Sequence, residues 1–334
     1  MAIMRGLITS TTKVAFMNNL LYPMRMQPAL KVKVWGGRKL ETMLGKSLPD
    51  DSPYGESWEI HDSAVIANGA LAGQTLGGAA KAHPTALLGE RHDPAAGIPL
   101  LAKFLDAQDW LSVQVHPNDA QAAQLEGEPR GKTEAWYVLH AEPGAKLVIG
   151  VHPGTSSAEM ARAIRDNTLE KLLVYHEVTA GDVLFMHANT IHALGPGILI
   201  YEIQQSSDVT YRLYDWGRVD LDGKPRALHI DKGVLVANTE SLPSIRHTGM
   251  QTDAEEVQIA SSPFFNTVLH RLRGTERVVE MGGTFHLLTC IDGTVTARAE
   301  SGEPITLEKG CSAFMPAGLG RFTLSGTGDV LRAW

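Results

Sequence analysis

The stretch from residue 110 to residue 139 constrains the fold most, because it sets metal-binding side chains on two short strand-like runs. In the first run, Leu111–His116, apolar and polar residues alternate, so Gln114 and His116 project from the same face of a strand. The second run begins at Glu134 and alternates in the same way. Imidazole nitrogen and carboxylate oxygen suit zinc, and also iron or manganese. The stretch therefore predicts a divalent metal site in a β-rich framework.

A third protein ligand is expected downstream, in the segment GDVLFMHANTIHALGPG, which offers His187 and His192. We prefer His192, because it follows the turn at residues 189–190 and can point back into a pocket. His187 is the rival candidate. The chain has 13 histidines, so no single one of them would carry the prediction. The hypothesis rests on the strand spacing within residues 110–139.

Three basic residues near these runs are candidates for binding an anionic substrate: Lys132, Arg212 and Arg218. Lys132 lies two residues before Glu134 and therefore shares its strand face. Arg212 alternates with aromatic and β-branched residues, which is typical of a partly buried side chain. A partly buried arginine needs an anion, and the sequence leaves open whether that anion is a structural carboxylate or a ligand phosphate.

Short strand-like runs separated by glycine-containing turns dominate the rest of the chain. Many of them follow one another between Phe264 and Ala333, which favours an all-β sandwich or barrel. Helical periodicity is clearest in Asp119–Leu125 and in an insert at about residues 154–175, capped by Ser156 or Ser157. We therefore expect a mainly β fold with a small helical insert.

Changes in the pattern of strand-like runs, turns and helical periodicity along the chain predict the domain organisation. Residues 1–26 are expected to form a poorly ordered N-terminal extension. Residues 27–240 would form a catalytic domain that contains the helical insert, and residues 250–334 a second β domain. The best linker candidate is residues 242–255, because it combines proline, glycine and mixed polar residues.

Composition argues against two classes of function. The formal net charge is −7 over 334 residues, and no run of five like charges occurs, so a nucleic-acid surface is not supported. No apolar run approaches the roughly 18 residues of a membrane helix, and the N-terminal residues lack the continuous apolar core of a signal peptide. Cys290 and Cys311 lie in apolar runs and are expected to be buried thiols, which favours a reducing, cytoplasmic location. The sequence leaves the oligomeric state open.

Several of these segments together resemble a known family. VQVHPND, GKTEAWYVL and GDVLFMHANTIHALGPGILIYEIQQSSDVTYRLYDWGR, with the earlier WGG and GESWEI, are similar to type I phosphomannose isomerases of the short bacterial form, in the cupin superfamily. The resemblance is specific from about Val32 to Arg218 and diffuse over roughly the last hundred residues. It is absent from about the first 25 residues. Longer members carry an extra helical domain, and the insert occupies only part of its place.

The resemblance implies two cupin barrels of the jelly-roll type, the second of which has lost its metal ligands. In the family the metal is zinc, and we expect one ion per chain, bound by the residues that match His116, Glu134 and His192. Gln114 matches a glutamine that is a fourth ligand in longer members. The family's catalytic arginine falls on Arg212, and Lys132 matches a lysine in the substrate pocket.

The reaction implied is the interconversion of mannose 6-phosphate and fructose 6-phosphate through a cis-enediol, so the expected partner is a small sugar phosphate. The catalytic base is left open, because the histidines and the glutamate are committed to the metal. Two other functions are weighed against this one. A cupin with two histidines and one glutamate can be an iron oxygenase, and the fold can also bind a sugar phosphate without turnover. The lysine and arginine lining disfavours the first, and the intact ligand set disfavours the second.

Overall fold

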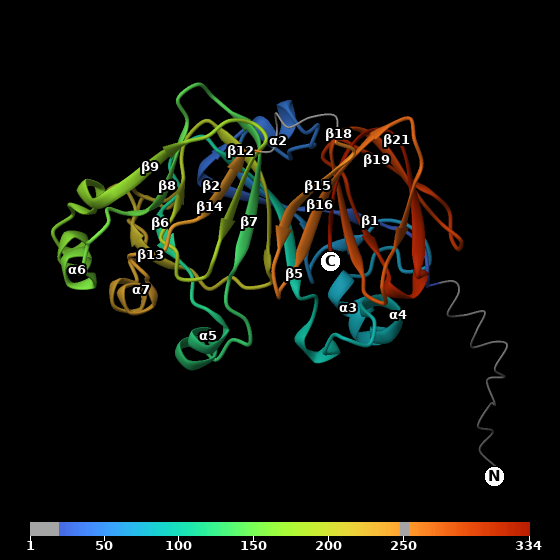
Figure 1. Ribbon diagram of the computed structural model, residues 1–334, viewed down its shortest axis with the longest axis horizontal. Helices are drawn as coiled ribbons and strands as arrows, with labels where there is room; N and C mark the ends of the chain where they lie inside the picture. The colour runs from blue at the N-terminus through green and yellow to red at the C-terminus, as the bar shows by residue number, and fades with distance from the viewer. Residues whose placement is uncertain (1–19, 248–253) are drawn as a thin grey trace, which may run out of the picture.

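The computed structural model describes residues 20–247 and 254–334, which form two groups of β-strands lying side by side, with short helices at their edges (Figure 1). The predicted mainly β fold is confirmed. In the first group, a seven-stranded antiparallel sheet has the order β14-β10-β7-β12-β5-β3-β2. Its strands are β2 (Ala29–Gly37), β3 (Tyr54–Ile60), β5 (Leu100–Ala107), β7 (Glu134–Ala141), β10 (Asp182–Met186), β12 (Ile198–Gln205) and β14 (Ser244–His247).

Two smaller sheets complete this first barrel, because they pack against the inner face of the large sheet. They consist of β6 (Val113–Val115) with β13 (Tyr211–Tyr214), and of β8 (Lys146–Val151) between β9 (Leu173–Glu177) and β11 (Ala193–Leu194). The apolar core between the layers includes Trp136 and Val138 from β7, with Leu147 from β8.

The second barrel is a nine-stranded sheet. Its strands are β15 (Glu256–Ser261), β16 (Asn266–Arg273), β17 (Arg277–Glu280), β18 (His286–Ala299), β19 (Ile305–Glu308), β20 (Ser312–Met315) and β21 (Arg321–Ala333), joined by β1 (Met24–Gln27) and β4 (Val65–Ile66) from the start of the chain. Leu288 and Val330 belong to the core that it encloses.

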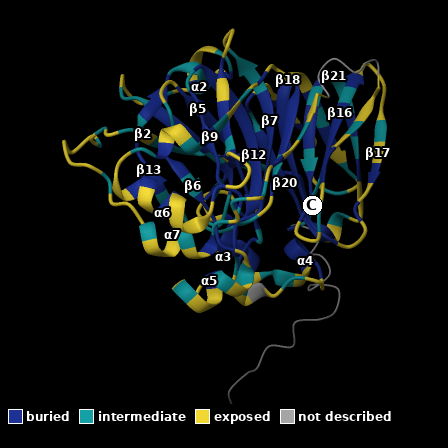
Figure 2. Cartoon of the chain, turned by 60° about the vertical axis from the view of Figure 1, so that its left-hand side comes forward, coloured by how far each residue is buried: buried dark blue, intermediate teal, exposed yellow. Residues whose placement is uncertain are grey.

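Helices cover the ends and the outer surface of the strands (Figure 2). They are α2 (Lys39–Thr42), α3 (Leu76–Ala82), α4 (Pro84–Leu88), α5 (Asp119–Glu126), α6 (Ser157–Arg165) and α7 (Ile230–Val236), with 3-10 turns at Pro94–Ala96, Leu169–Leu172 and Ala317–Leu319. In the predicted insert, the Ser156 side chain caps α6 by accepting a hydrogen bond from the Glu159 N–H at 3.1 Å. Met160 and Ile164 of α6 belong to one apolar cluster with Val113 of β6 and Leu213 of β13. The insert thus supports the strands that carry Gln114 and Arg212. No helix among residues 20–247 and 254–334 is long and apolar enough to cross a membrane.

The two barrels share an interface. Strands β5 and β12 lie next to it, and this explains why apolar and polar residues do not alternate cleanly along them. Every residue of β5 and β12 is buried. One face of each strand looks into the first barrel, and the other packs against the second, where Tyr137 and Leu199 meet Leu287 and Leu331 in one apolar cluster. The interface also holds a buried ion pair, with Lys46 Nζ at 2.6 Å from Glu59 Oε1.

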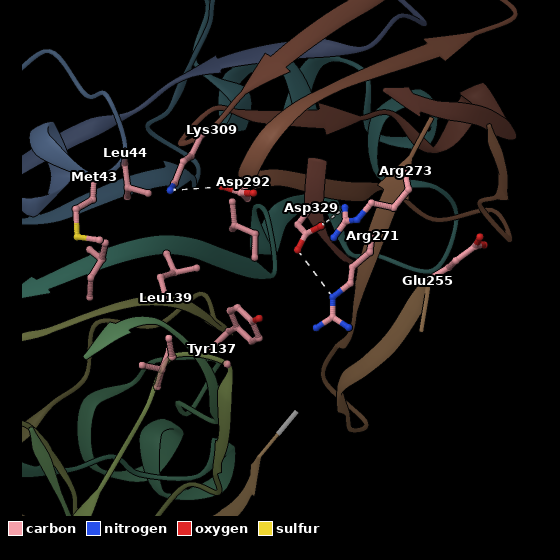
Figure 3. A pocket seen from close by; sticks show the side chains of 15 residues that line it. Met43, Leu44, Tyr137, Leu139, Glu255, Arg271, Arg273, Asp292, Lys309 and Asp329 are labelled. Carbon is pink, nitrogen blue, oxygen red and sulfur yellow. Dashed lines mark hydrogen bonds and ion pairs between the residues drawn. The ribbon is translucent and has the colours of Figure 1, made fainter. Parts of the chain in front are cut away.

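A crevice of about 870 Å³ runs along the edge of this interface (Figure 3). Asp329 lies between Arg271 and Arg273, at 3.9 Å and 2.8 Å respectively, and Lys309 pairs with Asp292 at 3.6 Å. The crevice is on the outer side of the first barrel, away from the cluster of predicted metal ligands.

Three expectations about segment boundaries differ from the structure. Residues 1–19 of the expected N-terminal extension lie outside the described residues, but Met24 and Met26 are buried in β1, which pairs with β20 and β4. Within the expected linker, Ser244–His247 form β14 and pair with β10, and residues 248–253 lie outside the described part. The division into domains at residues 27–240 and 250–334 stays a proposal.

The third difference concerns β18 and β21, because short runs separated by glycine-containing turns were expected in this part of the chain, whereas each of these strands is long and continuous. The two strands pair along their length, with a bulge between Cys290 and Asp292. Gly293 has φ +65°, and a Cβ there would lie 2.3 Å from the Thr327 carbonyl oxygen. The glycine therefore permits a close approach of two strands at a bulge, although in the sequence it looks like a turn residue.

Candidate metal centre

Three strand ends bring the candidate metal ligands together. His116 follows β6, Glu134 begins β7 and His192 immediately precedes β11. Gln114 and His192 are paired by two backbone hydrogen bonds of 3.0 Å, which place their side chains on one face. The ligand atoms of His116, Glu134 and His192 lie within 4.8 Å of one another, and all three residues are buried.

The two imidazole rings are fixed so that their Nε2 atoms face the glutamate. His192 Nε2 lies 3.1 Å from Glu134 Oε1, and His116 Nε2 lies 3.7 Å from Glu134 Oε2. Each Nδ1 is 2.9 Å from a backbone carbonyl oxygen, that of Val209 for His116 and that of Thr190 for His192. An Nδ1–H that donates to a carbonyl leaves the Nε2 lone pair available, which is the arrangement of metal-binding histidines.

The rival histidine lies elsewhere. His187 is exposed, and its ring packs against Phe185 at a centroid distance of 4.8 Å. Gln114, the candidate fourth ligand, is partly buried and its Nε2 lies 3.3 Å from His192 Nε2. The structure therefore brings Gln114 to the cluster and leaves His187 outside it.

Lys132 is the cation nearest to the cluster. Its Nζ lies 2.7 Å from Glu134 Oε2, 3.2 Å from His116 Nε2 and 3.5 Å from Glu202 Oε1. Burial disfavours the charged ammonium, but the carboxylates of Glu134 and Glu202 outweigh this effect and raise the pKa of Lys132. For Glu134, burial opposes ionisation, yet Lys132 and the two histidines hold its pKa well below the usual range. Burial and the Lys132 ammonium together hold the pKa of His116 well below its usual range, which favours the neutral imidazole that a metal ligand requires.

A cavity of about 280 Å³ opens beside the cluster and is lined by Gln114, Lys132, Trp136, Glu202 and Arg212, among others. Arg212 donates from Nη1 to the Ala227 carbonyl at 2.8 Å, and its buried Nε has no hydrogen-bond partner. Burial and the neighbouring Arg226 lower the pKa of Arg212.

The anion that binds Arg218 is a structural carboxylate of the protein itself. Its guanidinium pairs with Asp215 at 2.9 Å and with Asp109 at 3.4 Å. Arg226 binds the same Asp215 carboxylate, with Nε at 2.8 Å from Oδ2. One carboxylate thus pairs with both of these cations, and Arg226 lines the cavity together with Arg212.

Sequence reasoning missed Glu202, a buried carboxylate that lines the cavity. It sits opposite Lys103 on β5 and opposite Trp136 on β7, and its Oε1 is 3.3 Å from Lys103 Nζ. Burial and the nearby Glu134 raise its pKa. The signal was a lone glutamate in the apolar run ILIYEIQQ, because a charge in a strand buried on both faces needs a partner or a function.

A β-barrel that holds two histidines and a glutamate in its interior defines a metal-binding cupin. Family models agree: residues 23–137 match "Phosphomannose isomerase type I, catalytic domain" and residues 255–334 match "Mannose-6-phosphate isomerase, cupin domain". A mannose-6-phosphate isomerase of Streptococcus mutans is 34% identical over 92% of this chain and 97% of its own. One from Bacillus subtilis is also 34% identical, over 92% of this chain and 98% of its own.

Solved structures give the same result. The crystal structure of a mannose 6-phosphate isomerase from Bacillus subtilis superimposes with a TM-score of 0.85 at 30% identity, and covers 93% of this chain and 99% of that one. A zinc-bound mannose 6-phosphate isomerase superimposes with a TM-score of 0.74 over 93% of this chain and 99% of that one, and at 19% identity it supports the fold alone. This chain belongs to the type I phosphomannose isomerase family.

Proposed function

We propose that this chain is a zinc-dependent mannose-6-phosphate isomerase, which interconverts mannose 6-phosphate and fructose 6-phosphate through a cis-enediol. The observation that carries the proposal is the buried cluster of His116, Glu134 and His192 beside a cavity lined with cations. Relatives that share about a third of its residues along nearly the whole chain bear the same activity in their names.

The residues present fit a zinc ion. Two imidazole Nε2 atoms and one carboxylate converge in a buried cluster, and Gln114 offers an amide as a fourth group. Zinc prefers three or four ligands of this kind, and a catalytic site leaves one position for substrate. Bound there, one zinc per chain would neutralise charge that develops on the sugar oxygens.

The chain's own residues would bind the substrate and stabilise the intermediate. Isomerisation moves one proton between C2 and C1 of the open-chain sugar, and negative charge develops on the enediol oxygens. Arg212, with an unpaired Nε facing the cavity region, would stabilise that charge or hold the open-chain substrate. Lys132 would contact the sugar oxygens or the phosphate as an ammonium donor. Lys132 is 6% exposed, so competing water is excluded from its ammonium, whereas Arg212 is half-buried.

A cytoplasmic location is also part of the proposal. Cys290 in β18 and Cys311, just before β20, are free thiols, as suits a reducing compartment; Cys290 is buried as expected, whereas Cys311 is only partly buried. Fractionation of the source cells would test this location directly.

The test is isomerase activity of the purified protein on mannose 6-phosphate, before and after chelation, with zinc added back. We expect activity to vanish with chelator and to return with about one zinc per chain. A folded, zinc-loaded protein without activity would refute the substrate assignment. Purified protein that holds iron and responds to iron alone would instead favour the oxygenase alternative.

A further inference from the structure

Among the polar groups of the cavity wall that the reaction outlined above does not use is a buried indole. Trp136 is 1% exposed, and its indole Nε1–H has no hydrogen-bond acceptor in the described protein. A buried donor left without an acceptor is costly, and native proteins rarely keep one without a reason. Because Trp136 lines the cavity that also contains Gln114 and Lys132, a bound molecule can supply the missing acceptor.

The strand register defines what surrounds the indole. Trp136 lies two residues after Glu134 on the same face of β7, so it stands directly beyond the metal ligands. Its ring meets His192 edge to face, with centroids 5.5 Å apart and an interplanar angle of 82°. The rest of the ring packs in the apolar core of the first barrel, beside Leu111 and Leu184, and these side chains offer no acceptor.

Glu202 is the polar neighbour of Trp136 across the sheet. The two residues are directly opposed on β12 and β7, and opposed side chains on one face have Cβ atoms about 5 Å apart. Lys103 is opposed to Glu202 on its other side, so donor, carboxylate and ammonium form one row across three strands. A hydroxyl group matches the Trp136–Glu202 pair, since its oxygen accepts one hydrogen bond and its hydrogen donates another.

We propose that the Trp136 indole N–H binds a hydroxyl of the sugar, at C3 or C4, which in turn donates to the Glu202 carboxylate. The inference rests on the proposed function and adds a residue that selects and positions the substrate. The oxygens on C1 and C2 belong beside the metal ligands, and C6 carries the phosphate. The open chain then has free hydroxyls on C3, C4 and C5, and those on C3 and C4 are the nearest to the reacting carbons and so to the wall beyond Glu134.

The experiment compares the zinc-loaded wild type with Trp136→Phe on three substrates: mannose 6-phosphate and its 3-deoxy and 4-deoxy derivatives. Phenylalanine keeps an aromatic ring beside His192 and removes the donor together with part of the indole ring. On mannose 6-phosphate we expect kcat/KM to fall about tenfold, as for the loss of one buried hydrogen bond. On the deoxy sugar that lacks the bonding hydroxyl the variant should match the wild type, and on the other it should again be about tenfold slower.

Two controls keep the result specific. Trp110→Phe makes the same replacement outside the cavity, where the ring packs on Trp216 and Tyr175, and should leave all three values unchanged. Zinc content and thermal unfolding of Trp136→Phe establish that the metal centre and the fold are retained.

Three results would overturn the inference. Wild-type kcat/KM for Trp136→Phe on mannose 6-phosphate would mean that the N–H binds water or nothing. An equal loss on all three substrates would mean that the ring only shapes the cavity. If Trp136→Phe does not fold, the kcat/KM values of the wild type on the two deoxy sugars test the inference instead. Values equal to that on mannose 6-phosphate for both deoxy sugars would contradict a hydroxyl contact. Failure of the wild type on mannose 6-phosphate would instead refute the proposed function.

Discussion

Removal of the Glu59 carboxylate should destabilise the protein far more than the loss of an ordinary surface charge. Glu59 is 1% exposed, and it accepts hydrogen bonds from Lys46 Nζ at 2.6 Å, Ser57 Oγ at 2.5 Å and Ser312 Oγ at 3.0 Å. Ser312 and the carbonyl of Gly310, which also binds Lys46, come from the second barrel. The carboxylate therefore joins the two barrels directly through Ser312, and indirectly through Lys46, which also binds the Gly310 carbonyl.

The expected cost follows from what Glu59→Ala leaves behind. Breaking a buried ion pair by removal of one partner costs about 3–5 kcal/mol, because the other charge stays buried. We expect about 3 kcal/mol, near the lower limit, because Lys46 keeps the Gly310 carbonyl at 2.5 Å. Ser312 also keeps Thr289 at 3.0 Å. A loss of about 3 kcal/mol is roughly a 150-fold change in the unfolding equilibrium constant.

Urea unfolding, followed by fluorescence and by circular dichroism, would measure this cost. The matched control is Glu177→Ala, because Glu177 is 67% exposed in its side chain and lies 3.6 Å from Lys146, so its loss should cost well under about 1 kcal/mol. The double variant Lys46→Met with Glu59→Leu removes both charges together and should regain most of the stability. The reasoning is refuted if Glu59→Ala costs no more than the control, or if the double variant is as unstable as the single one.

Further predictions concern the metal centre, the cavity and acid stability. His116→Ala and Glu134→Ala should each bind less than about a tenth of the wild-type zinc by elemental analysis and lose activity with it. Arg212→Ala should keep its zinc while kcat falls by about 100-fold or more, and loss of zinc would contradict its role. Burial and Arg332 lower the pKa values of His270 and His286 to about 3, whereas unfolded imidazoles bind protons near pH 6.5. Stability should therefore fall as the pH drops from about 6.5 to 3, by up to about 2.7 kcal/mol per pH unit, and a flat profile in urea titrations would exclude this.

The metal centre could be predicted in part from local spacing. Gln114, His116 and Glu134 lie in strands whose alternation is visible in the sequence, and the structure brings their side chains together. The choice between His192 and His187 depends on the backbone pairing of His192 with Gln114, which is a contact between distant segments. Spacing alone left that choice open for this reason, and the family resemblance decided it.

The remaining misses also come from contacts between distant strands. The place of Glu202 in the cavity depends on its neighbours Lys103 and Trp136, which oppose it on two different strands and are far from it in sequence. Gly293 looks like a hairpin residue, because in a sequence a positive-φ glycine in a bulge cannot be told from one in a turn. Alternation was also invisible in β12, since both of its faces are buried.

The pairing of β1 with β20 has a consequence for the order of events during synthesis. Met24 opposes Phe314, so a strand made near the start of the chain finds its partner close to the end. At translation speeds of about 5–20 residues per second, β1 waits on the order of 15–60 s before β20 leaves the ribosome. A nascent chain must therefore keep the side chains of Met24 and Met26, which are buried in the folded protein, protected until β20 has emerged and the second barrel can close.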